Sequence, residues 1–484
     1  MLDLPTKIYE PAVPLWEHQL EALAKMKGKV GFAILMAMRT GKSATLLADF
    51  GQMELDGQVQ DLLVIAPAGV CHTWPKAVRE HGSADLQARL AVHVWESKPM
   101  APKKAAPFLA NLKGPRCLIV NIEALSSKTS KARPVCEKFL SQRRNMVAID
   151  ESTTIKNYKA KRTKYITKVL GPIANYRRIL SGLATPRSPL DLYCQFEFLD
   201  WHILQQGSFV AFRNKYAVMK TDWFGGRRVD HVVGFHAGTE ERLRALIEPY
   251  SCRVEFRPKI PSTYSMREIE LTEDQAKAYQ EMLEFATTQL ASTDHVTATV
   301  VVAQIGKLHQ ILCGHVIDEN GVEHQLPENR TAALIDELTD YSGKAIVWFT
   351  YVTDLERCAK AVEKEFGQGC VARFYGGNKA TRENDEDRFQ NDPRCQFMFA
   401  TAGAGGRGRT WSVADRVVYF STSYDLEHRE QSEQRPLGVE KDRQVDFVDF
   451  VVPNSVEMKI LKALREKINM ATAINGDTYK EWLI

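Results

Sequence analysis

Short apolar runs alternate with amphipathic segments in two separate stretches of the chain. In the first stretch, apolar runs that predict buried strands lie at residues 32–37, 61–67, 117–122, 145–150 and 177–182. In the second stretch, such runs lie at residues 345–349, 371–375, 396–400, 416–420 and 445–451. Strands that alternate with helical segments imply a parallel sheet with both faces covered. The pattern therefore predicts an α/β protein with two parallel-sheet lobes.

The region between the two arrays has a different pattern. Residues 200–261 predict helices and a hairpin, in which Gly225-Gly226 suits a two-residue turn, and residues 262–316 predict a largely helical insert. A chain of 484 residues is too long for one core, because cores stop growing at about 250–300 residues. We expect a first lobe over residues 1–205, a mainly helical region over 206–329 and a second lobe over 330–484, closed by INGDTYKEWLI with no accessory domain after it.

The strand at residues 32–37 continues through the sequence MRTGKS into a helix. In this order, backbone N–H groups at the helix N-terminus can surround a polyphosphate, a lysine neutralises its outer oxygens, and a hydroxyl ligates Mg²⁺. An ordinary turn between strand and helix is the alternative, since the usual opening glycine is missing. The predicted nucleotide-binding residues are Arg39, Thr40, Gly41, Lys42 and Ser43, with Lys42 also catalytic and Ser43 also a Mg²⁺ ligand.

Two carboxylates, Asp150 and Glu151, follow the apolar run at residues 145–149. Because parallel sheets bind ligands beyond the carboxyl ends of their strands, this pair is expected to meet the phosphate-binding loop. An aspartate there can hold Mg²⁺ through water, and an adjacent glutamate can orient and deprotonate the attacking water. A solvated acidic loop is the alternative. The position after a buried strand and downstream of GKS favours a catalytic Mg-ATP site.

Two further segments carry candidate binding residues. Gln19 stands at the start of a helical pattern, and its amide offers the donor and the acceptor that suit the edge of an adenine. A glutamine on a helix surface is the simpler interpretation. Residues 155–170 predict a basic helix, which is either a solvated face or a contact with a phosphate backbone. Its clustered basic residues are Lys156, Lys159, Lys161, Arg162 and Lys164.

A family resemblance covers the whole first lobe. PLWEHQ, MRTGKS, IAPAGVCHTW, VNIEAL, DESTTIKN and SGLATPRSPLDLYCQFEFL, in this order, resemble the Q motif and motifs I, Ia, Ib, II and III of superfamily-two helicase-like ATPases. The pairing of DEST with IKN is similar to the Swi/Snf-type branch in its compact phage and bacterial form. The resemblance implies two RecA-like lobes with helical protrusions. It makes Lys42 and Ser43 the phosphate and Mg²⁺ residues, Asp150 and Glu151 the Walker B pair, and Gln19 the adenine reader.

The same resemblance extends to the second lobe. TAGAGGRGRTW corresponds to motif V, in which Thr401 would approach a nucleic-acid phosphate. YDLEHREQSEQRPLGVEKDRQVDFVDFV corresponds to motif VI, and Gln431 and Arg435 fall on the family's glutamine and first arginine. The family's nucleic-acid contacts also imply roles for Lys156, Asn157 and Lys161.

The chain departs from the family pattern at several positions. Gly438 stands where the family carries its second arginine, the arginine finger that acts on the γ-phosphate, and Glu440-Lys441 replaces Gly-Gln. Ser181-Gly182-Leu183-Ala184 replaces the motif III sequence Ser/Thr-Gly-Thr-Pro, and Arg39 replaces the usual glycine of motif I.

Composition adds constraints of its own. The chain is 44% hydrophobic and 26% charged, with a net charge of +4 that neither proves nor opposes a polyanionic partner. Nine cysteines without a CxxC pair suggest reduced thiols and no structural metal. The N-terminus lacks signal-peptide features, and no apolar run approaches the ~18–20 residues of a membrane span. We expect a protein of the bacterial or phage-infected host cytoplasm, without membrane contact.

Gly438 separates two functional hypotheses, because an arginine finger is worth about 10³–10⁵ in turnover. The first is a DNA-dependent ATPase that uses ATP and Mg²⁺ to translocate on double-stranded DNA, with Arg435, Arg407 or Arg409 as the replacement finger. The second is a hydrolysis-impaired, ATP-gated DNA clamp. Both would hold the DNA phosphate backbone with little sequence preference, and a recruiting protein partner would be unidentified. A P-loop kinase or metabolite-binding ATPase would leave the second lobe unexplained.

Overall fold

A computed structural model describes residues 8–98, 100–182, 188–224, 227–255, 260–292, 298–318, 320–405, 410–438 and 441–466. The chain divides into two compact units. Unit 1 comprises Met1–Val218 and Phe235–Arg257, and unit 2 comprises Met219–Gly234 and Pro258–Ile484. The segment INGDTYKEWLI, predicted to close the second lobe, lies outside the described residues.

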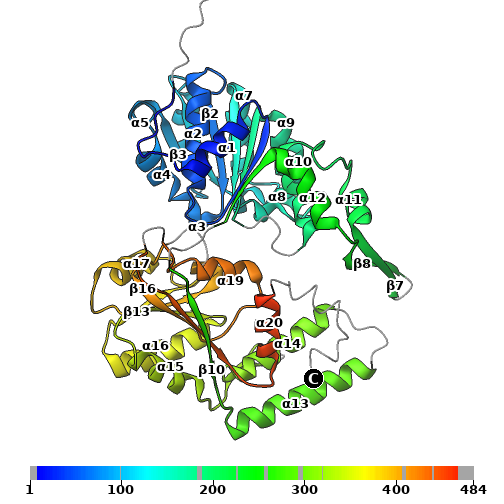
Figure 1. Cartoon of the computed structure of the whole chain (residues 1–484), viewed down its shortest axis with the longest axis vertical. Helices are drawn as coiled ribbons and strands as arrows, with labels where there is room; N and C mark the ends of the chain where they lie inside the picture. The colour runs from blue at the N-terminus through cyan, green and yellow to red at the C-terminus, as the bar shows by residue number, and fades with distance from the viewer. Residues whose placement is uncertain are drawn as a thin grey trace, which may run out of the picture. The chain divides into compact units, whose positions relative to one another are not determined.

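Unit 1 contains a seven-stranded sheet in the order β3-β4-β2-β5-β6-β1-β9, and all neighbouring strands are parallel (Figure 1). The five predicted strands are confirmed. The additional strands β3 and β9 are short and only partly buried, which is why apolar runs did not reveal them. The strands are β1 (Gly31–Met36), β2 (Asp61–Ala66), β3 (Ala91–Val94), β4 (Arg116–Asn121), β5 (Asn145–Asp150), β6 (Tyr176–Leu180) and β9 (Ser251–Val254).

Both faces of this sheet are covered, as predicted. Alternate side chains of each central strand enter two separate cores, so the middle of each strand is a continuous apolar run. One core is completed by α1 (Glu17–Met26), α2 (Lys42–Leu55), α4 (Trp74–His81) and α5 (Ala84–Arg89). The other is completed by α6 (Ala101–Ala110), α7 (Ala132–Gln142) and α10 (Leu192–Leu199).

Unit 2 contains a six-stranded parallel sheet in the order β10-β17-β16-β13-β15-β14. Five of its strands match the predicted array: β13 (Lys344–Phe349), β14 (Val371–Phe374), β15 (Phe397–Thr401), β16 (Ala414–Tyr419) and β17 (Asp446–Val451). Its principal helices are α15 (Arg330–Thr339), α16 (Val352–Phe366), α17 (Arg382–Asn391), α19 (Leu426–Glu433) and α20 (Val456–Arg465). The predicted fold class, α/β with two parallel-sheet lobes, is confirmed.

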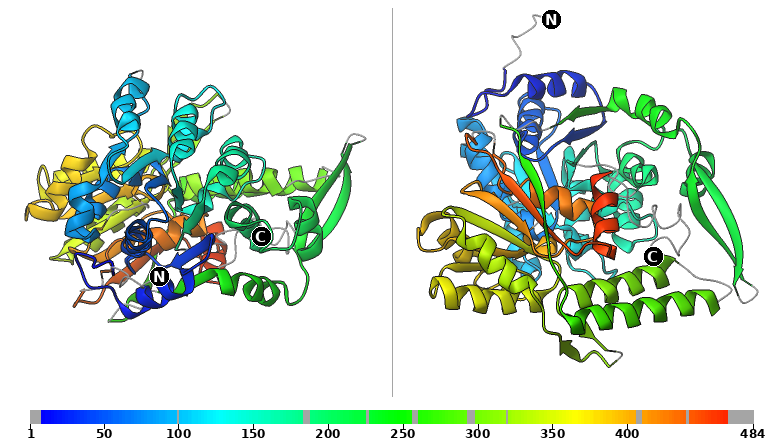
Figure 2. Two further views of the ribbon diagram at one scale, coloured as in Figure 1. Left: turned by 90° about the horizontal axis from the view of Figure 1, so that it is seen from above. Right: turned by 60° about the horizontal axis from the view of Figure 1, so that its bottom comes forward.

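The insert at residues 262–316 is largely helical, as predicted, but it begins with a strand that the sequence pattern did not reveal. Strand β10 (Thr263–Glu268) pairs in parallel with β17 at the edge of the sheet. Its side chains are mostly exposed, so main-chain hydrogen bonds rather than apolar burial hold it there, and hydrophobic periodicity could not reveal it. The remainder of the insert forms α13 (Glu273–Ser292) and α14 (Ala298–Leu312), which lie side by side (Figures 1 and 2).

The predicted hairpin is present as β7 (Ala217–Phe224) and β8 (Arg227–Phe235), between α11 (Phe209–Tyr216) and α12 (Thr239–Ile247). Its turn, Gly225-Gly226, lies outside the described residues. None of the helices in the described part of the chain combines the length and the apolar character needed to cross a membrane.

The predicted basic helix over residues 155–170 is shorter than expected. The helix α8 is confined to Lys161–Tyr165 and continues as a π-helical turn over Ile166–Leu170. Before it, the Asn157 side chain accepts a hydrogen bond from the Lys159 backbone N–H (2.9 Å). Such a side-chain turn competes with helix formation, so residues 156–160 are not helical.

Candidate nucleotide-binding site

Strand register aligns the carboxyl ends of three neighbouring strands in unit 1. Leu180 of β6 lies opposite Ile34 of β1 on one side and opposite Asp150 of β5 on the other. The loop after β1 and the carboxylates after β5 therefore emerge at the same edge of the sheet, separated by one strand. This is the arrangement that the sequence predicted for the phosphate-binding loop and the acidic pair.

The loop between β1 and α2 has the backbone shape of a phosphate-binding loop. Arg39 and Gly41 have φ angles of 66° and 83°, so their backbones are left-handed. Gly41 immediately precedes α2, and Lys42 and Ser43 are its first two residues. Lys42 Nζ donates hydrogen bonds to the carbonyl oxygens of Met36 (3.0 Å) and Ala37 (3.2 Å). The lysine is thus folded over the loop at the helix N-terminus, where anions bind.

Arg39 keeps a glycine-like conformation at the position where the family has glycine. A left-handed backbone costs a non-glycine residue about 1–2 kcal/mol. Burial lowers the pKa of its guanidinium to about 10, which leaves it charged at neutral pH. Thr40, which follows it, is buried and donates from its hydroxyl to the Ala37 carbonyl (2.7 Å). A direct contact of Arg39 or Thr40 with nucleotide stays a prediction.

Gln19 is buried on α1 and ties this helix to the loop. Its Oε1 accepts the Trp16 backbone N–H (2.7 Å), and its Nε2 donates to the Gly41 carbonyl (3.0 Å). A Cβ at Gly41 would lie 2.1 Å from Gln19 Nε2 and would displace this amide, and the positive φ of Gly41 also favours glycine. Since a primary amide has two donors and two lone pairs, one of each is left over. Reading of adenine by Gln19 stays a prediction.

The two carboxylates at the end of β5 are both buried, with exposed fractions of 7% for Asp150 and 8% for Glu151. Burial, and then the neighbouring charge of Glu151, raise the pKa of Asp150 to about 6, although Lys42 opposes the shift. Asp150 Oδ1 accepts the Glu151 backbone N–H (2.9 Å). The carboxyl end of β5 therefore concentrates negative charge next to the phosphate-binding loop.

Glu151 itself has a left-handed backbone, with φ of 48°. This conformation is strained for glutamate, and strain of this kind is concentrated at functional sites. It lets the chain leave β5 sharply and enter the 3₁₀ turn η2 (Ser152–Ile155). Within that turn the Thr154 hydroxyl donates to the Glu151 carbonyl (2.9 Å), which holds the bend in place.

Trp74 completes the surroundings of Asp150, and the sequence did not point to it. Its indole Nε1–H donates to Asp150 Oδ2 at 3.1 Å, and the side chain is 1% exposed. Trp74 begins α4, beyond β2, and β2 is the direct neighbour of β5 in the sheet. That neighbour relation is the signal that could have revealed the contact, but it requires the strand order, which the sequence pattern does not supply.

The donor set suits a divalent cation with a bound polyphosphate. The neighbouring charge of Glu151 raises the pKa of Asp150, and a cation relieves this repulsion. Ser43, half-buried at the second position of α2, carries a hydroxyl of the type that ligates Mg²⁺. Asp150, Ser43 and Lys42 would hold Mg²⁺ and the phosphates. Mg²⁺ would neutralise the negative charge that develops on the phosphates during hydrolysis.

Exposed basic side chains follow the same end of the sheet. Of the predicted nucleic-acid residues in unit 1, Asn157 and Lys161 are exposed and Lys156 is half-buried. Lys164 is exposed as well, whereas Arg162 uses its Nε–H to bond the Thr154 carbonyl (3.0 Å). Two exposed lysines that the sequence did not single out, Lys128 and Lys131, follow the turn η1 (Ile122–Leu125), which contacts α8.

The predicted site residues of unit 2 belong to a separate group. Thr401 ends β15 and is half-buried, and Gln431 lies on α19, where its Nε2 donates to Glu427 Oε1 (3.3 Å). Arg435 follows α19 and is fully buried. Two statements stay predictions: that Arg435 acts as the arginine finger, and that Gly438 occupies the position where the family carries this arginine. The motif V arginines Arg407 and Arg409, and Leu183, Ala184 and Glu440, lie outside the described residues.

Comparisons with known proteins identify the family. The family description "SNF2-related domain" matches residues 25–316, and "Helicase conserved C-terminal domain" matches residues 329–437. The chain is 22% identical to the Bacillus subtilis "Putative ATP-dependent helicase/translocase YwqA" over 90% of its own length and 46% of that protein. It is 22% identical to the B. subtilis "Uncharacterized ATP-dependent helicase YqhH" over 98% of its length and 82% of that protein.

Among solved structures, the chain is similar to the Sulfolobus solfataricus SWI2/SNF2 ATPase core in complex with dsDNA. The match covers 98% of this chain and 96% of that one, at 20% identity and a TM-score of 0.42. The chain spans about half of YwqA and most of YqhH. Since the SNF2-related description alone covers more than half of the residues, the chain belongs to the SNF2-related family of helicase-type ATPases.

Proposed function

We propose that the chain is a DNA-dependent ATPase that translocates along double-stranded DNA. One observation carries the ATPase part: the strand register places Lys42 and the buried pair Asp150 and Glu151 at the same edge of one parallel sheet. Phosphoryl transfer is catalysed mainly by positioning and by charge stabilisation, which these three side chains supply.

Each residue of unit 1 would have a defined part in hydrolysis. Lys42 would move from the carbonyls of Met36 and Ala37 to the phosphate oxygens of a bound nucleotide. Asp150, ionised and held by Trp74, would bind Mg²⁺ through water. Glu151 would take the proton of the attacking water. Its left-handed backbone fixes the position from which its side chain extends.

The DNA part rests on family membership and on the exposed lysines near the carboxyl end of β5. Lys128, Lys131, Lys161 and Lys164 are exposed on neighbouring segments of unit 1; we call them the basic edge. Lysines on such a surface contact phosphates and carry little sequence information. The related YwqA is named a putative helicase/translocase, which agrees with movement along a nucleic acid.

Steady-state ATP turnover with and without linear duplex DNA tests the proposal. We expect DNA to stimulate turnover, and Glu151→Gln to reduce it by about 10²–10⁴-fold while ATP binding is retained, because general base catalysis is worth that factor. Lys42→Ala is the contrasting variant and is expected to lose ATP binding itself. Turnover that is measurable but indifferent to DNA would contradict the DNA-dependent function.

The clamp hypothesis predicts a different outcome of the same assay. It rests on Gly438, which stands where the family carries the finger arginine. A clamp would bind DNA in an ATP-dependent and Lys42-dependent manner with no turnover above background. Turnover that is stimulated by DNA and lost on Arg435→Ala would instead assign the finger role to Arg435.

A further inference from the structure

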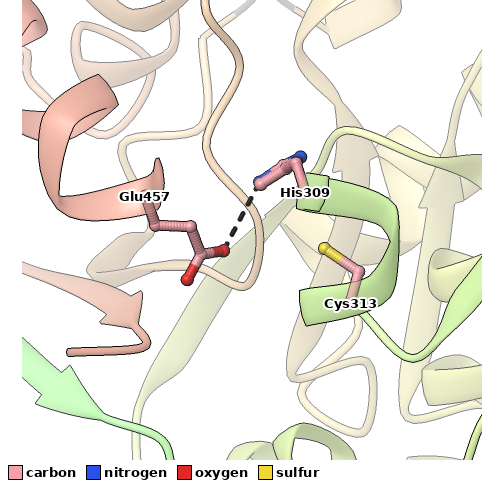
Figure 3. A group of neighbouring side chains, drawn as sticks. All are labelled: His309, Cys313 and Glu457. Atoms are coloured by element: carbon pink, nitrogen blue, oxygen red, sulfur yellow. Dashed lines mark ion pairs between the residues drawn. The ribbon is translucent and has the colours of Figure 1, made fainter. Parts of the chain in front are cut away.

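A buried cluster of metal-ligand side chains lies in unit 2. His309 on α14, Cys313 one turn later and Glu457 on α20 each offer one ligand atom, and these atoms lie within 4.8 Å of one another. Figure 3 shows the three side chains directed toward a common space. His309 and Cys313 are fully buried and Glu457 is 3% exposed.

Two of the ligand atoms have no hydrogen bond although they are buried. His309 Nε2 and Glu457 Oε1 face each other at 3.4 Å, and neither atom makes a hydrogen bond. Zinc bound to a histidine nitrogen and a carboxylate oxygen at about 2.0–2.1 Å holds the two atoms about 3.3 Å apart in tetrahedral geometry. The observed separation therefore fits a shared ion.

The surrounding residues orient these atoms as the partners of metal ligands do. Glu457 Oε2 accepts hydrogen bonds from Arg330 (2.7 Å) and from the Val452 backbone N–H (2.9 Å), which directs Oε1 toward the cluster. His309 Nδ1 lies 3.0 Å from the Tyr351 hydroxyl. A ligating histidine usually donates its other ring N–H to an oxygen, and Tyr351 is placed to accept it.

The charge of the environment also suits a divalent cation with one thiolate. Arg330 pairs with Glu457, and Arg357 pairs separately with Asp354 and Glu328, while His315 also lies against Asp354. Counted with neutral histidines, the two arginines and three carboxylates carry one net negative charge. Zinc with one cysteine thiolate brings one net positive charge, so the loaded cluster is neutral. Bound zinc would also deprotonate Cys313, whose pKa is raised well above its ordinary value by burial.

We propose that His309, Cys313 and Glu457 bind a zinc ion through three protein ligands. The mixed nitrogen, sulfur and oxygen set is typical of zinc, whereas Mg²⁺ and Ca²⁺ prefer oxygen ligands alone. The ion links His309 and Cys313, at the end of α14, to Glu457, at the start of α20. It therefore holds the helical insert against the core of unit 2. The sequence predicted no structural metal because the third ligand lies far along the chain from the His-x₃-Cys pair. This proposal does not depend on the proposed function.

The metal content of the purified full chain tests the proposal. The protein is produced with zinc in the medium, without a histidine tag or chelator, and zinc is measured by mass spectrometry. We expect one zinc per chain in the wild type and a loss of zinc in Cys313→Ala. Cys358→Ala is the matched control, since Cys358 is also a fully buried cysteine of unit 2 but lies outside the cluster. It is expected to keep its zinc.

Cobalt exchange provides a second measurement that does not require a folded variant. Wild-type protein refolded with Co²⁺ is expected to show thiolate-to-cobalt charge-transfer absorption, and added zinc is expected to abolish it and to raise Tm. A zinc-free wild type that also lacks this absorption would overturn the proposal and leave a direct His309–Glu457 ion pair. Equal zinc content in Cys313→Ala and Cys358→Ala would overturn it as well.

Discussion

The Asp150 carboxylate is held by two donors on its own unit, the Trp74 indole N–H and the Glu151 backbone N–H. Both hydrogen bonds favour the ionised form, whereas burial and Glu151 favour the protonated form. The result is a carboxyl whose pKa, about 6, is close to neutral. A small change in these hydrogen bonds is therefore sufficient to change the fraction of ionised Asp150.

We predict that kcat/KM for Mg-ATP falls as the pH decreases through about 6, because Mg²⁺ requires the ionised carboxylate and the pKa of Asp150 is about 6. Trp74→Phe keeps most of the packing and removes the N–H, so the decrease should move to higher pH. Since a hydrogen bond to a charged group is worth about 1.5–3 kcal/mol, kcat/KM at pH 6 should fall roughly tenfold or more. A pH series of kcat/KM measures both effects.

Trp95→Phe is the control, because Trp95 is equally buried but belongs to the other core of the same sheet. Its pH profile is expected to match the wild type. Identical profiles for both variants would show that Trp74 only fills space.

The stability of the fold should change with pH in the opposite direction from activity. The raised pKa of Asp150 means that the folded state binds this proton more tightly than the unfolded state, so the contribution of Asp150 to stability decreases as the pH rises from about 4 to 6.

The site residues that the sequence could predict are those that follow directly from one strand. Lys42 and the pair Asp150 and Glu151 each come at the end of an apolar run, and parallel strands share a carboxyl edge. Trp74 could not be predicted in this way, since its contact depends on β2 lying next to β5. The left-handed backbones of Arg39 and Glu151 could not be predicted from the sequence either, because neither residue type favours a positive φ.

At the scale of elements, the apolar pattern revealed the strands that are mostly buried, including the edge strand β14, and missed the more exposed edge strands β3, β9 and β10. β10 is held by its ladder with β17, and the half-buried β3 lies at the other sheet's edge. Helix α8 was overestimated because the basic residues before it are compatible with a helix, while the Asn157 side chain stabilises a turn. Edge pairing and local turns are therefore where composition and periodicity carry least information.

The helix that follows the phosphate-binding loop is fixed to the sheet by a buried ion pair. Arg178 of β6 donates from Nε to Asp49 Oδ2 of α2 at 2.8 Å, and the arginine is 1% exposed. We predict that Arg178→Met lowers the free energy of unfolding by about 3–5 kcal/mol, because it leaves a buried carboxylate unpaired. Urea unfolding of the full chain measures the change. Adding Asp49→Leu to this variant should recover part of the loss.

Arg89→Met is the matched control for this pair. Arg89 also binds a carboxylate of α2, Glu54 at 2.7 Å, but its side chain is 36% exposed. An exposed ion pair contributes about 0–1 kcal/mol, so this variant should change the free energy of unfolding little. If the two substitutions had equal effects, the Arg178–Asp49 pair would not be what secures α2 to the sheet.

At the scale of the whole molecule, two alternating arrays in the sequence were sufficient to predict two parallel-sheet units. They could not predict how residues distant in the sequence meet inside a unit. His309 and Glu457 belong to different helices, and only the packing of α14 and α20 brings them together. The same limitation applies to the basic edge, which combines lysines from the loop after β4 with lysines of α8.

The basic edge should dominate the salt dependence of DNA binding. Each phosphate neutralised by a lysine adds about 0.9 to the slope of log K against log salt concentration. We predict that Lys161→Gln with Lys164→Gln reduces this slope by about 2 and weakens binding to all duplex sequences alike. Fluorescence anisotropy with two unrelated duplexes over a series of salt concentrations measures slope and sequence preference together.

The control for this double variant is Lys76→Gln with Arg79→Gln. These residues are exposed on α4 with the same spacing of three, and α4 packs on the other core of the sheet. The control therefore removes the same charge from unit 1 without touching the basic edge. If the effect came from net charge alone, both double variants would weaken DNA binding equally. A smaller slope in the Lys161 and Lys164 variant alone would place the phosphate backbone against α8, next to the strand end that carries Asp150 and Glu151.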